Sequence, residues 1–146
     1  MEKQLNSEPI VKKIKLDFKD SKYATGRRKK SIAKVWLKKG SGHIYVNGKK
    51  MPDYFKKQNL QMAIFRPLVI VKRENEFDVR CFVRGGGLTG QAGAIIHGLS
   101  RALIQFEPDL KPTLKKEKLT TRDSRAVERK KYGHRKARRS FQFSKR

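Results

Sequence analysis

The last part of the chain limits where a hydrophobic core can form. Residues 129–146 contain nine Lys and Arg residues and no acid. Such a segment cannot bury enough apolar surface to offset the entropy that it would lose on folding. We therefore expect it to be disordered alone and to become ordered only against its partner. Core-forming residues are already sparse from about Lys111 onward, so the core must be built by the preceding residues.

Alternating apolar residues between about positions 21 and 110 predict strands. Ala33, Val35 and Leu37 fall on one side of segment 31–38, which indicates a half-buried strand. The Gly-Ser-Gly sequence at 40–42 then predicts a hairpin into a strand at 44–46, which ends at the Asn-Gly turn pair. A further strand with a partly basic face is expected at 77–84.

The helical signals lie between and after these strands. Pro52 predicts the start of a short helix, and residues 58–65 predict a second one that stops near Pro67. Residues 68–71 fit a strand or a helix equally well. The strongest helix is expected at 91–106, where apolar residues recur along one stripe. Two neighbouring strands, short helices and one long helix predict a small α+β two-layer sandwich.

Composition divides the chain into three parts. Residues 1–21 form an N-terminal extension, either a mobile arm or a short edge strand carrying Ile14, Leu16 and Phe18. Residues 22–110 form the expected globular domain, and residues 111–146 form a basic C-terminal extension. The first twenty residues fit neither a secretory signal nor a transit peptide, because they include four acids and no Arg.

The charge indicates the kind of partner. Lys and Arg number 38 against 13 Asp and Glu, a formal net charge of +25. A compact domain with this charge needs a polyanion, and the many Arg residues favour nucleic acid. An acidic membrane surface is the weaker option. The single cysteine, Cys81, excludes a cysteine-based zinc site, and the three histidines lie far apart, so we expect no metal, no cofactor and no small-molecule substrate.

One glycine motif suggests an enzyme at first sight. Gly85, Gly87 and Gly90 have the spacing of a dinucleotide-binding turn between a strand and a helix. The preceding strand carries charged residues at alternate positions, however, and no second strand follows the helix with the acid that would hold a ribose. We therefore predict no enzyme. The turn either presents amides to a nucleic-acid phosphate or only packs the helix against the sheet.

Aromatic residues in the C-terminal extension favour RNA. Tyr132, Phe141 and Phe143 are interleaved with cations, and such rings can stack on unpaired bases. A second basic run, from Ser21 to Lys50, holds ten cations and no acid. A basic DNA-binding protein of the chromatin or nucleoid type is the alternative, and residues 130–139 also fit a nuclear-import signal.

With these motifs assembled, the chain resembles the family of small-subunit ribosomal protein nine, of the bacterial or organellar type. The matching segments are 23–29 (YATGRRK), 85–87 (GGG), 90–95 (GQAGAI), 101–103 (RAL), 121–123 (TRD), 127–131 (VERKK), 135–139 (RKARR) and 142–146 (QFSKR). Family members commonly have Pro where this chain has Phe141, which frees the backbone before the tip. The first twenty residues have no counterpart in the short bacterial members.

The resemblance implies a fold and partners. The fold would be an α+β domain of about four strands with helices on one face and a left-handed βαβ crossover. The protein would sit in the head of the small subunit, in the bacterial cytoplasm or in an organelle. It would bind rRNA beside neighbouring ribosomal proteins. Its extension would thread through rRNA to the peptidyl site, where Ser144, Lys145 and Arg146 would contact the bound tRNA.

The basic runs, the glycine turn and the resemblance together predict the rRNA-binding residues. They are Arg27, Arg28, Lys29, Lys30, Arg84, Gly85, Gly86, Gly87, Arg101, Arg122, Arg125, Arg129, Lys130, Lys131, Arg135, Lys136, Arg138 and Arg139.

Overall fold

The computed structural model describes residues 19–144 of the chain. Ile14, Leu16 and Phe18, for which a mobile arm or a short edge strand was expected, lie outside the described residues, as do Lys145 and Arg146 at the tip. Among the described residues, no helix combines the length and the apolar character needed to span a bilayer.

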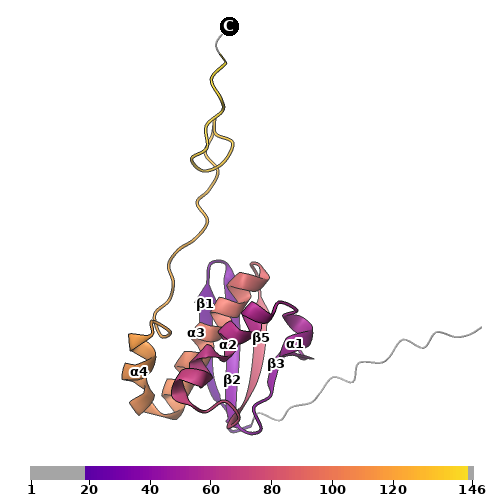
Figure 1. Cartoon of the computed structure of the whole chain (residues 1–146), viewed down its shortest axis with the longest axis vertical. Coiled ribbons are helices and arrows are strands. Elements are labelled where there is room, and N and C mark those ends of the chain that lie inside the picture. The colour runs from indigo at the N-terminus through magenta and orange to yellow at the C-terminus, as the bar shows by residue number, and fades with distance from the viewer. Residues whose placement is uncertain (1–18, 145–146) are drawn as a thin grey trace, which may run out of the picture.

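A five-stranded mixed sheet forms one layer of the fold (Figure 1). Its strands are β1 (Lys22–Arg28), β2 (Ser31–Lys39), β3 (Ile44–Val46), β4 (Lys49–Lys50) and β5 (Phe77–Arg84). Their order across the sheet is β1-β2-β5-β3-β4, and only the β3–β5 pair is parallel. Four strands make up the body of the sheet, as expected, and the two-residue β4 extends its edge.

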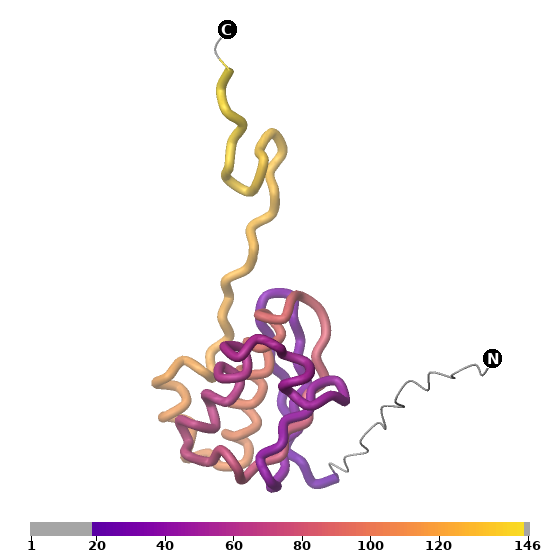
Figure 2. The backbone as a smooth tube through the Cα atoms, turned by 45° about the vertical axis from the view of Figure 1, so that its right-hand side comes forward, coloured from indigo at the N-terminus to yellow at the C-terminus, as the bar shows by residue number. Residues whose placement is uncertain are grey.

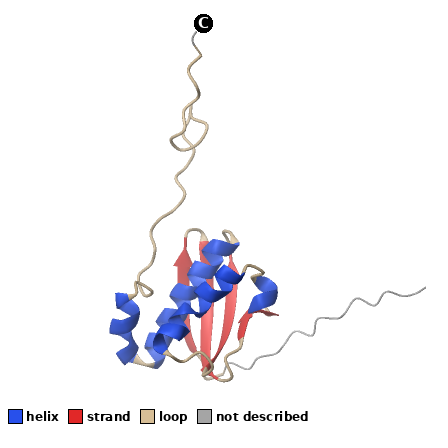
Figure 3. Cartoon of the chain, viewed as in Figure 1, coloured by secondary structure: helices blue, strands red, loops and turns tan. Residues whose placement is uncertain are grey.

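The helices form the second layer and cover one face of the sheet (Figure 3). They are α1 (Met51–Tyr54), α2 (Gln58–Val71), α3 (Leu88–Phe106) and α4 (Lys111–Lys116), with a 3-10 turn at Pro108–Leu110. Viewed from the helix side with β3 and β5 pointing upward, the chain passes from β3 leftward to β5, which is a left-handed crossover (Figure 1). The α+β sandwich predicted from the sequence is therefore confirmed.

The core lies between the sheet and α3, and it follows the predicted alternation. Ala33, Val35 and Leu37 of β2 are fully buried, and β5 alternates in the same way from Phe77 to Val83. Because successive residues of a strand point to opposite faces, this alternation leaves the other face of the sheet to polar and aromatic residues. Cys81 is buried in the core, and burial raises the pKa of its thiol, as expected for an unreactive cysteine.

The predicted hairpin between β2 and β3 is wrong. The two strands do not pair, because β5 lies between them and forms a long antiparallel ladder with β2. The connecting loop instead bends around the start of β5, where the Asp78 carboxylate accepts hydrogen bonds from the Ser41 N–H (3.0 Å) and the His43 N–H (2.9 Å). A hairpin does form one step later, between β3 and β4, across the Asn47–Gly48 turn.

The predicted stop before Pro67 is also wrong. Helix α2 continues through Pro67 to Val71, which places residues 68–71 in a helix. A proline removes one helical hydrogen bond, but here Pro67 and Leu68 are both buried, and their packing offsets that loss. Lys72 caps the end of the helix: its backbone is left-handed (φ 58°), and its N–H donates to the carbonyls of Leu68 and Val69.

Two further elements had not been expected. Segment 22–28, read only as a basic run, is an edge strand whose Ala24 and Gly26 face α3. After α3, the chain adds α4, and Leu114 and Leu119 are buried in the core. The packed part of the molecule thus continues to Leu119, where the extended tail begins (Figure 2).

Candidate nucleic-acid interface

His97 ties the start of the tail to the edge of the sheet. Its Nδ1 accepts a hydrogen bond from the Arg27 N–H of β1 (3.2 Å), and the ring also hydrogen-bonds the backbone of Thr120. Partial burial lowers the pKa of His97, and the positive charge of Arg101 lowers it further. The ring is therefore held neutral, which is the form that can accept the Arg27 N–H.

A second contact fixes the tail three residues later. Arg28 of β1 and Asp123 of the tail form an ion pair with Nη2 and Oδ2 3.2 Å apart. The Asp123 carboxylate also accepts hydrogen bonds from the Arg125 guanidinium (2.9 Å) and the Arg125 N–H (3.1 Å). Hydrogen bonding to Arg125, together with the charge of Arg28, holds the pKa of Asp123 well below its usual range. Both contacts define what we call the tail root, residues 120–125.

Glycines in α3 make room for this arrangement. A side chain at Gly93 would collide with the aliphatic part of Arg28, which lies across the helix on its way to Asp123. A side chain at Gly26 or Gly98 would drive β1 and α3 apart, because the two backbones touch there. The α3 glycines are thus needed for packing, one of the two roles considered for the glycine-rich stretch.

Beyond the root, the tail leaves the domain as an extended chain. It rises past β1 and continues away from the sandwich, with one small loop on its way (Figures 1 and 2). In that loop the Arg135 N–H donates to the Arg139 carbonyl (2.7 Å), and the Arg135 guanidinium lies 5.2 Å from the centre of the Phe141 ring. Tyr132 and Phe143 are fully exposed along the tail. Cations and rings of the tail therefore face solvent rather than the core.

The glycine turn lies beside the tail. Gly85 (φ 76°) and Gly86 (φ 61°) adopt left-handed backbone, which explains why glycine is present at both positions. The Ser31 hydroxyl donates to the Gly85 carbonyl (2.9 Å) and fixes the turn against β2. Gly87 differs, because its φ is −107° and nothing lies within 4 Å of the position that a side chain would take.

A surface cavity of about 750 Å³ separates this turn from the tail. It is lined by Lys29 and Lys30 from the β1–β2 turn, by Gly86 and Gly87, and by residues 126–129 of the tail. Gly87 is the N-cap of α3, and no side chain caps the helix there. Unpaired amides at a helix N-terminus attract anions, and here two lysines and Arg129 border the same space.

The predicted rRNA-binding residues fall into three groups. The first group consists of five arginines in or beside the tail root, and two of them also stabilise the fold. They are Arg27, Arg28, Arg101, Arg122 and Arg125. Arg28 pairs with Asp123, and Arg101 donates to the Thr25 carbonyl (2.7 Å). A second group borders the cavity at the glycine turn, and the third follows the tail from Lys130 to Arg139. Arg84 stands apart, on the sheet face opposite the helices.

Sequence reasoning missed His97 and Asp123 as the residues that hold the tail. The sequence showed His97 only as one of three histidines that lie far apart. Its partners, Arg27 and Thr120, lie far from it in sequence, so no local pattern could reveal the contact. The sequence motif around Asp123 gave no indication that its carboxylate meets Arg28.

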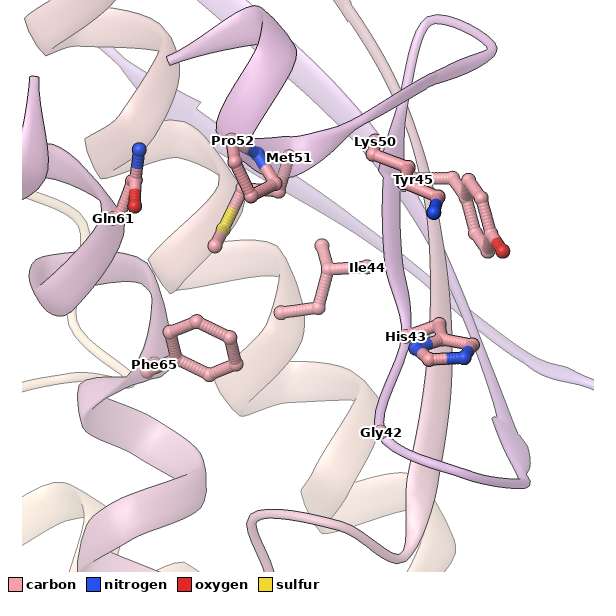
Figure 4. Close-up of a pocket in the computed structure, with 9 residues that line it drawn as sticks. All are labelled: Gly42, His43, Ile44, Tyr45, Lys50, Met51, Pro52, Gln61 and Phe65. Atoms are coloured by element: carbon pink, nitrogen blue, oxygen red, sulfur yellow. The ribbon is translucent and has the colours of Figure 1, made fainter. Parts of the chain in front are cut away.

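A separate small pocket of about 230 Å³ opens at the β3 edge (Figure 4). Ile44, Met51 and Phe65 form its apolar wall, and the Gln61 amide donates to the Phe55 carbonyl (2.6 Å). The pocket lies at the other edge of the sheet from β1 and the tail root, and none of the predicted rRNA-binding residues lines it. Residues 19–144 contain no cluster of three His, Cys, Asp or Glu side chains that could hold a metal ion.

A comparison with protein families agrees with this arrangement. The family model described as Ribosomal protein S9/S16 matches residues 26–146, which include the sandwich from the end of β1 onward, the glycine turn and the whole tail. Members of this family are structural constituents of the small ribosomal subunit, where they bind rRNA and neighbouring ribosomal proteins. Because the match covers most of the chain, the protein belongs to the ribosomal protein S9/S16 family.

Proposed function

We propose that this protein binds small-subunit rRNA through the tail and the glycine turn, and that the tip of its tail contacts tRNA in the peptidyl site. The observation that carries the proposal is the double attachment of the tail root, by His97 to Thr120 and by Arg28 to Asp123. A root fixed at two points gives the extended tail a defined starting direction from the folded domain. The role is one of binding and positioning, without catalysis.

The length of the tail suits this role. From Asp123 to Arg146 the chain has enough residues to reach about 80 Å if fully extended. A polycation of this length can follow a path between RNA helices and neutralise phosphates along it. Lys and Arg contacts to phosphate carry little sequence information, so binding would depend mainly on the shape of the folded RNA.

The glycine turn offers a second site for the RNA backbone. The α3 amides near Gly87 border a cavity together with Lys29, Lys30 and Arg129. An RNA phosphate placed there would meet both the amides and three positive charges. The absence of a side chain at Gly87 would allow the close approach of a sugar–phosphate backbone.

The proposed tip consists of Ser144, Lys145 and Arg146. A terminal Arg can grip a tRNA phosphate with two parallel hydrogen bonds. Before the tip, this chain has Phe141 instead of the Pro that is common in the family. The contact between Arg135 and the Phe141 ring supplies packing that can restrict this part of the tail in place of a proline ring.

A three-residue deletion tests the tRNA contact. Small subunits would be assembled with the full chain or with a chain that ends at Phe143, and retention of peptidyl-site tRNA would be measured by filter binding. We expect normal assembly and faster tRNA loss, because residues 1–143 keep the root, the turn and the main cations. Failed assembly or unchanged tRNA retention would refute the proposed role of the tip.

A second experiment compares the affinity of the protein for rRNA with its affinity for DNA, because a basic DNA-binding protein is the alternative function. The full chain would be titrated with folded small-subunit rRNA and with duplex DNA at matched salt. We expect preference for the rRNA, since the exposed Tyr132 and Phe143 can stack on unpaired bases, which duplex DNA does not offer. Equal or tighter binding to the duplex would favour the alternative function.

A further inference from the structure

The face of the sheet opposite the helices carries aromatic rings and cations in register. We call it the open face, and it consists of the outward residues of β1, β2 and β5. In one row across the strands, Tyr23 lies opposite Trp36 and Trp36 lies opposite Arg80. The Tyr23 and Trp36 ring centres are 5.2 Å apart, and the Arg80 guanidinium lies 6.0 Å from the Trp36 ring centre. The row therefore forms a continuous aromatic and cationic platform.

The neighbouring rows continue this chemistry. Lys34 lies opposite Phe82, and both are exposed, Phe82 by 56%. In the next row, Ile32 lies between Arg27 and Arg84. The one acid among these outward residues, Asp78, already accepts the N–H groups of Ser41 and His43. The open face thus offers rings and positive charge, while its carboxylate serves the loop beside it.

Fold stability explains only part of this pattern. The tilted stack of Tyr23 on Trp36 is a cross-strand pair of the kind that stabilises antiparallel sheets. Phe82 has no such reason to be aromatic, because its partner across the strands is Lys34 and most of its side chain faces solvent. All helices of the described residues lie on the other side of the sheet, so none of them covers Phe82 (Figures 1 and 3). Tyr23 and Phe82 are exposed, and the partly buried Trp36 lies on the strand between theirs, so these rings together mark a binding surface.

We propose that the open face binds an unpaired stretch of rRNA. Bases would stack on the rings of Trp36 and Phe82, and the cations of their strands would contact the phosphates. A sheet that displays aromatic side chains is a known physical solution for holding splayed bases, since every base has a π-face. The excess of positive charge fits RNA and disfavours a basic protein partner. Arg27 also lines the groove at the tail root, and Arg84 directly precedes the glycine turn in sequence.

This inference uses a surface that the proposed function does not need, so the two can fail separately. The chain contains a single tryptophan, Trp36, which makes its intrinsic fluorescence a direct reporter of the open face. The full chain would be titrated with a short oligoadenylate and with an RNA duplex of equal phosphate number. We expect saturable quenching of Trp36 by the single strand and little change with the duplex, which binds the tail.

Two variants and two controls sharpen the result. Phe82→Ala should weaken oligoadenylate binding about ten-fold, the loss expected for one stacked base. Lys34→Gln should weaken it less, because one phosphate contact is lost. Met62→Ala on α2 and Lys115→Gln on α4 remove an exposed apolar side chain and a charge elsewhere, and they should leave binding unchanged. Absent quenching, or a Phe82→Ala affinity equal to that of the controls, would overturn the proposal.

The assembled small subunit gives a second readout. Ultraviolet irradiation should link nucleotides to peptides from β2 or β5, since stacked base–aromatic pairs cross-link efficiently at close contact. A nucleotide adduct within 31–39 or 77–84 supports the proposal. Absence of any adduct there overturns it, and protection of these strands from hydrogen exchange without an adduct would assign the face to a protein neighbour.

Discussion

Arg28 and Asp123 form an ion pair across the junction between the folded domain and its tail, with a separation of 3.2 Å. The Arg28 side chain reaches this position over Gly93 of α3. Strand β1, helix α3 and the first residues of the tail therefore meet at one point. The direction of a long basic tail is set there by a few contacts and not by a large interface.

Breaking this pair should release the root without unfolding the domain. In Asp123→Asn the amide can no longer neutralise Arg28 or accept the charge-assisted bonds from Arg125. Because both partners are partly exposed, we expect unchanged thermal unfolding and trypsin cleavage at Arg122 and Arg125 up to about five-fold faster. Glu117→Gln breaks the exposed pair of Arg66 with Glu117 (3.0 Å) and serves as the matched control. Equal cleavage rates in the two variants would contradict the role of Asp123.

The folded state should become less stable as the pH falls, because His97 resists protonation in the fold. Its pKa is lowered in the folded state, so the folded protein binds fewer protons than the unfolded chain as the pH falls below about 6.5. The stability is complete above that pH and decreases as the pH falls toward the folded-state pKa. One proton limits the slope to about 1.4 kcal/mol per pH unit, and solvent screening of the half-exposed ring makes it shallower.

The measurement is urea unfolding between pH 5 and 8, with His97→Gln as the comparison. We expect the variant to be less stable at pH 8 and to show a flatter pH profile, because His43 and His134 remain in both proteins. If the unfolding free energies of the two proteins change with pH in parallel, the folded state does not keep the His97 ring neutral.

The close approach of β1 and α3 predicts a sensitive site at Gly26. In Gly26→Ala the new methyl group would collide with the Ala94 carbonyl and the Gly98 backbone, which are not flexible side-chain ends. Overpacking of this kind costs about 1–3 kcal/mol of unfolding free energy, or more where backbone must shift. Urea unfolding checks this value. Gly87→Ala, where a side chain meets open space, is the control and should cost less, about 0.5–1 kcal/mol, because only a poorer N-cap results.

Gly87 also separates the two roles considered for the glycine turn. Threonine is a good N-cap residue, so Gly87→Thr should maintain the stability of α3. If an RNA phosphate approaches the turn closely, the branched side chain should weaken rRNA binding several-fold at fixed salt. Unchanged affinity with unchanged stability would leave only packing as the role of the turn.

Local periodicity could predict much of the fold, and it failed where distant segments compete. The alternation in β2 and β5 and the apolar stripe of α3 correctly predicted those elements and their buried faces. The β2–β3 hairpin was expected from the Gly-Ser-Gly sequence between the two strands, but β5 offers β2 a longer ladder. The helix was expected to end near Pro67 because proline usually breaks a helix. The burial of Pro67 and Leu68 against the rest of the protein, which favours the continued helix, is not visible in the local sequence.

The sequence indicated which residue types form the candidate interface, but it did not show how these residues are arranged in space. Runs of Lys and Arg indicated a polyanionic partner, and the resemblance indicated which one. The contacts of Arg28 with Asp123 and of Arg27 with His97 join residues far apart in sequence, so they cannot be predicted from the spacing of residues within a segment. The open face could have been noticed, because Trp36 and Phe82 occupy outward positions of alternating strands.

The salt dependence of rRNA binding tests the central claim most directly. A chain that ends at Glu128 keeps the tail root and loses nine cations. If those cations neutralise phosphates, the slope of log affinity against log salt should become shallower by about six to eight, since each released counterion contributes about 0.7–0.9. The domain should unfold at the same temperature in both chains. An equal slope for the full and the shortened chain would show that the tail does not bind the RNA backbone.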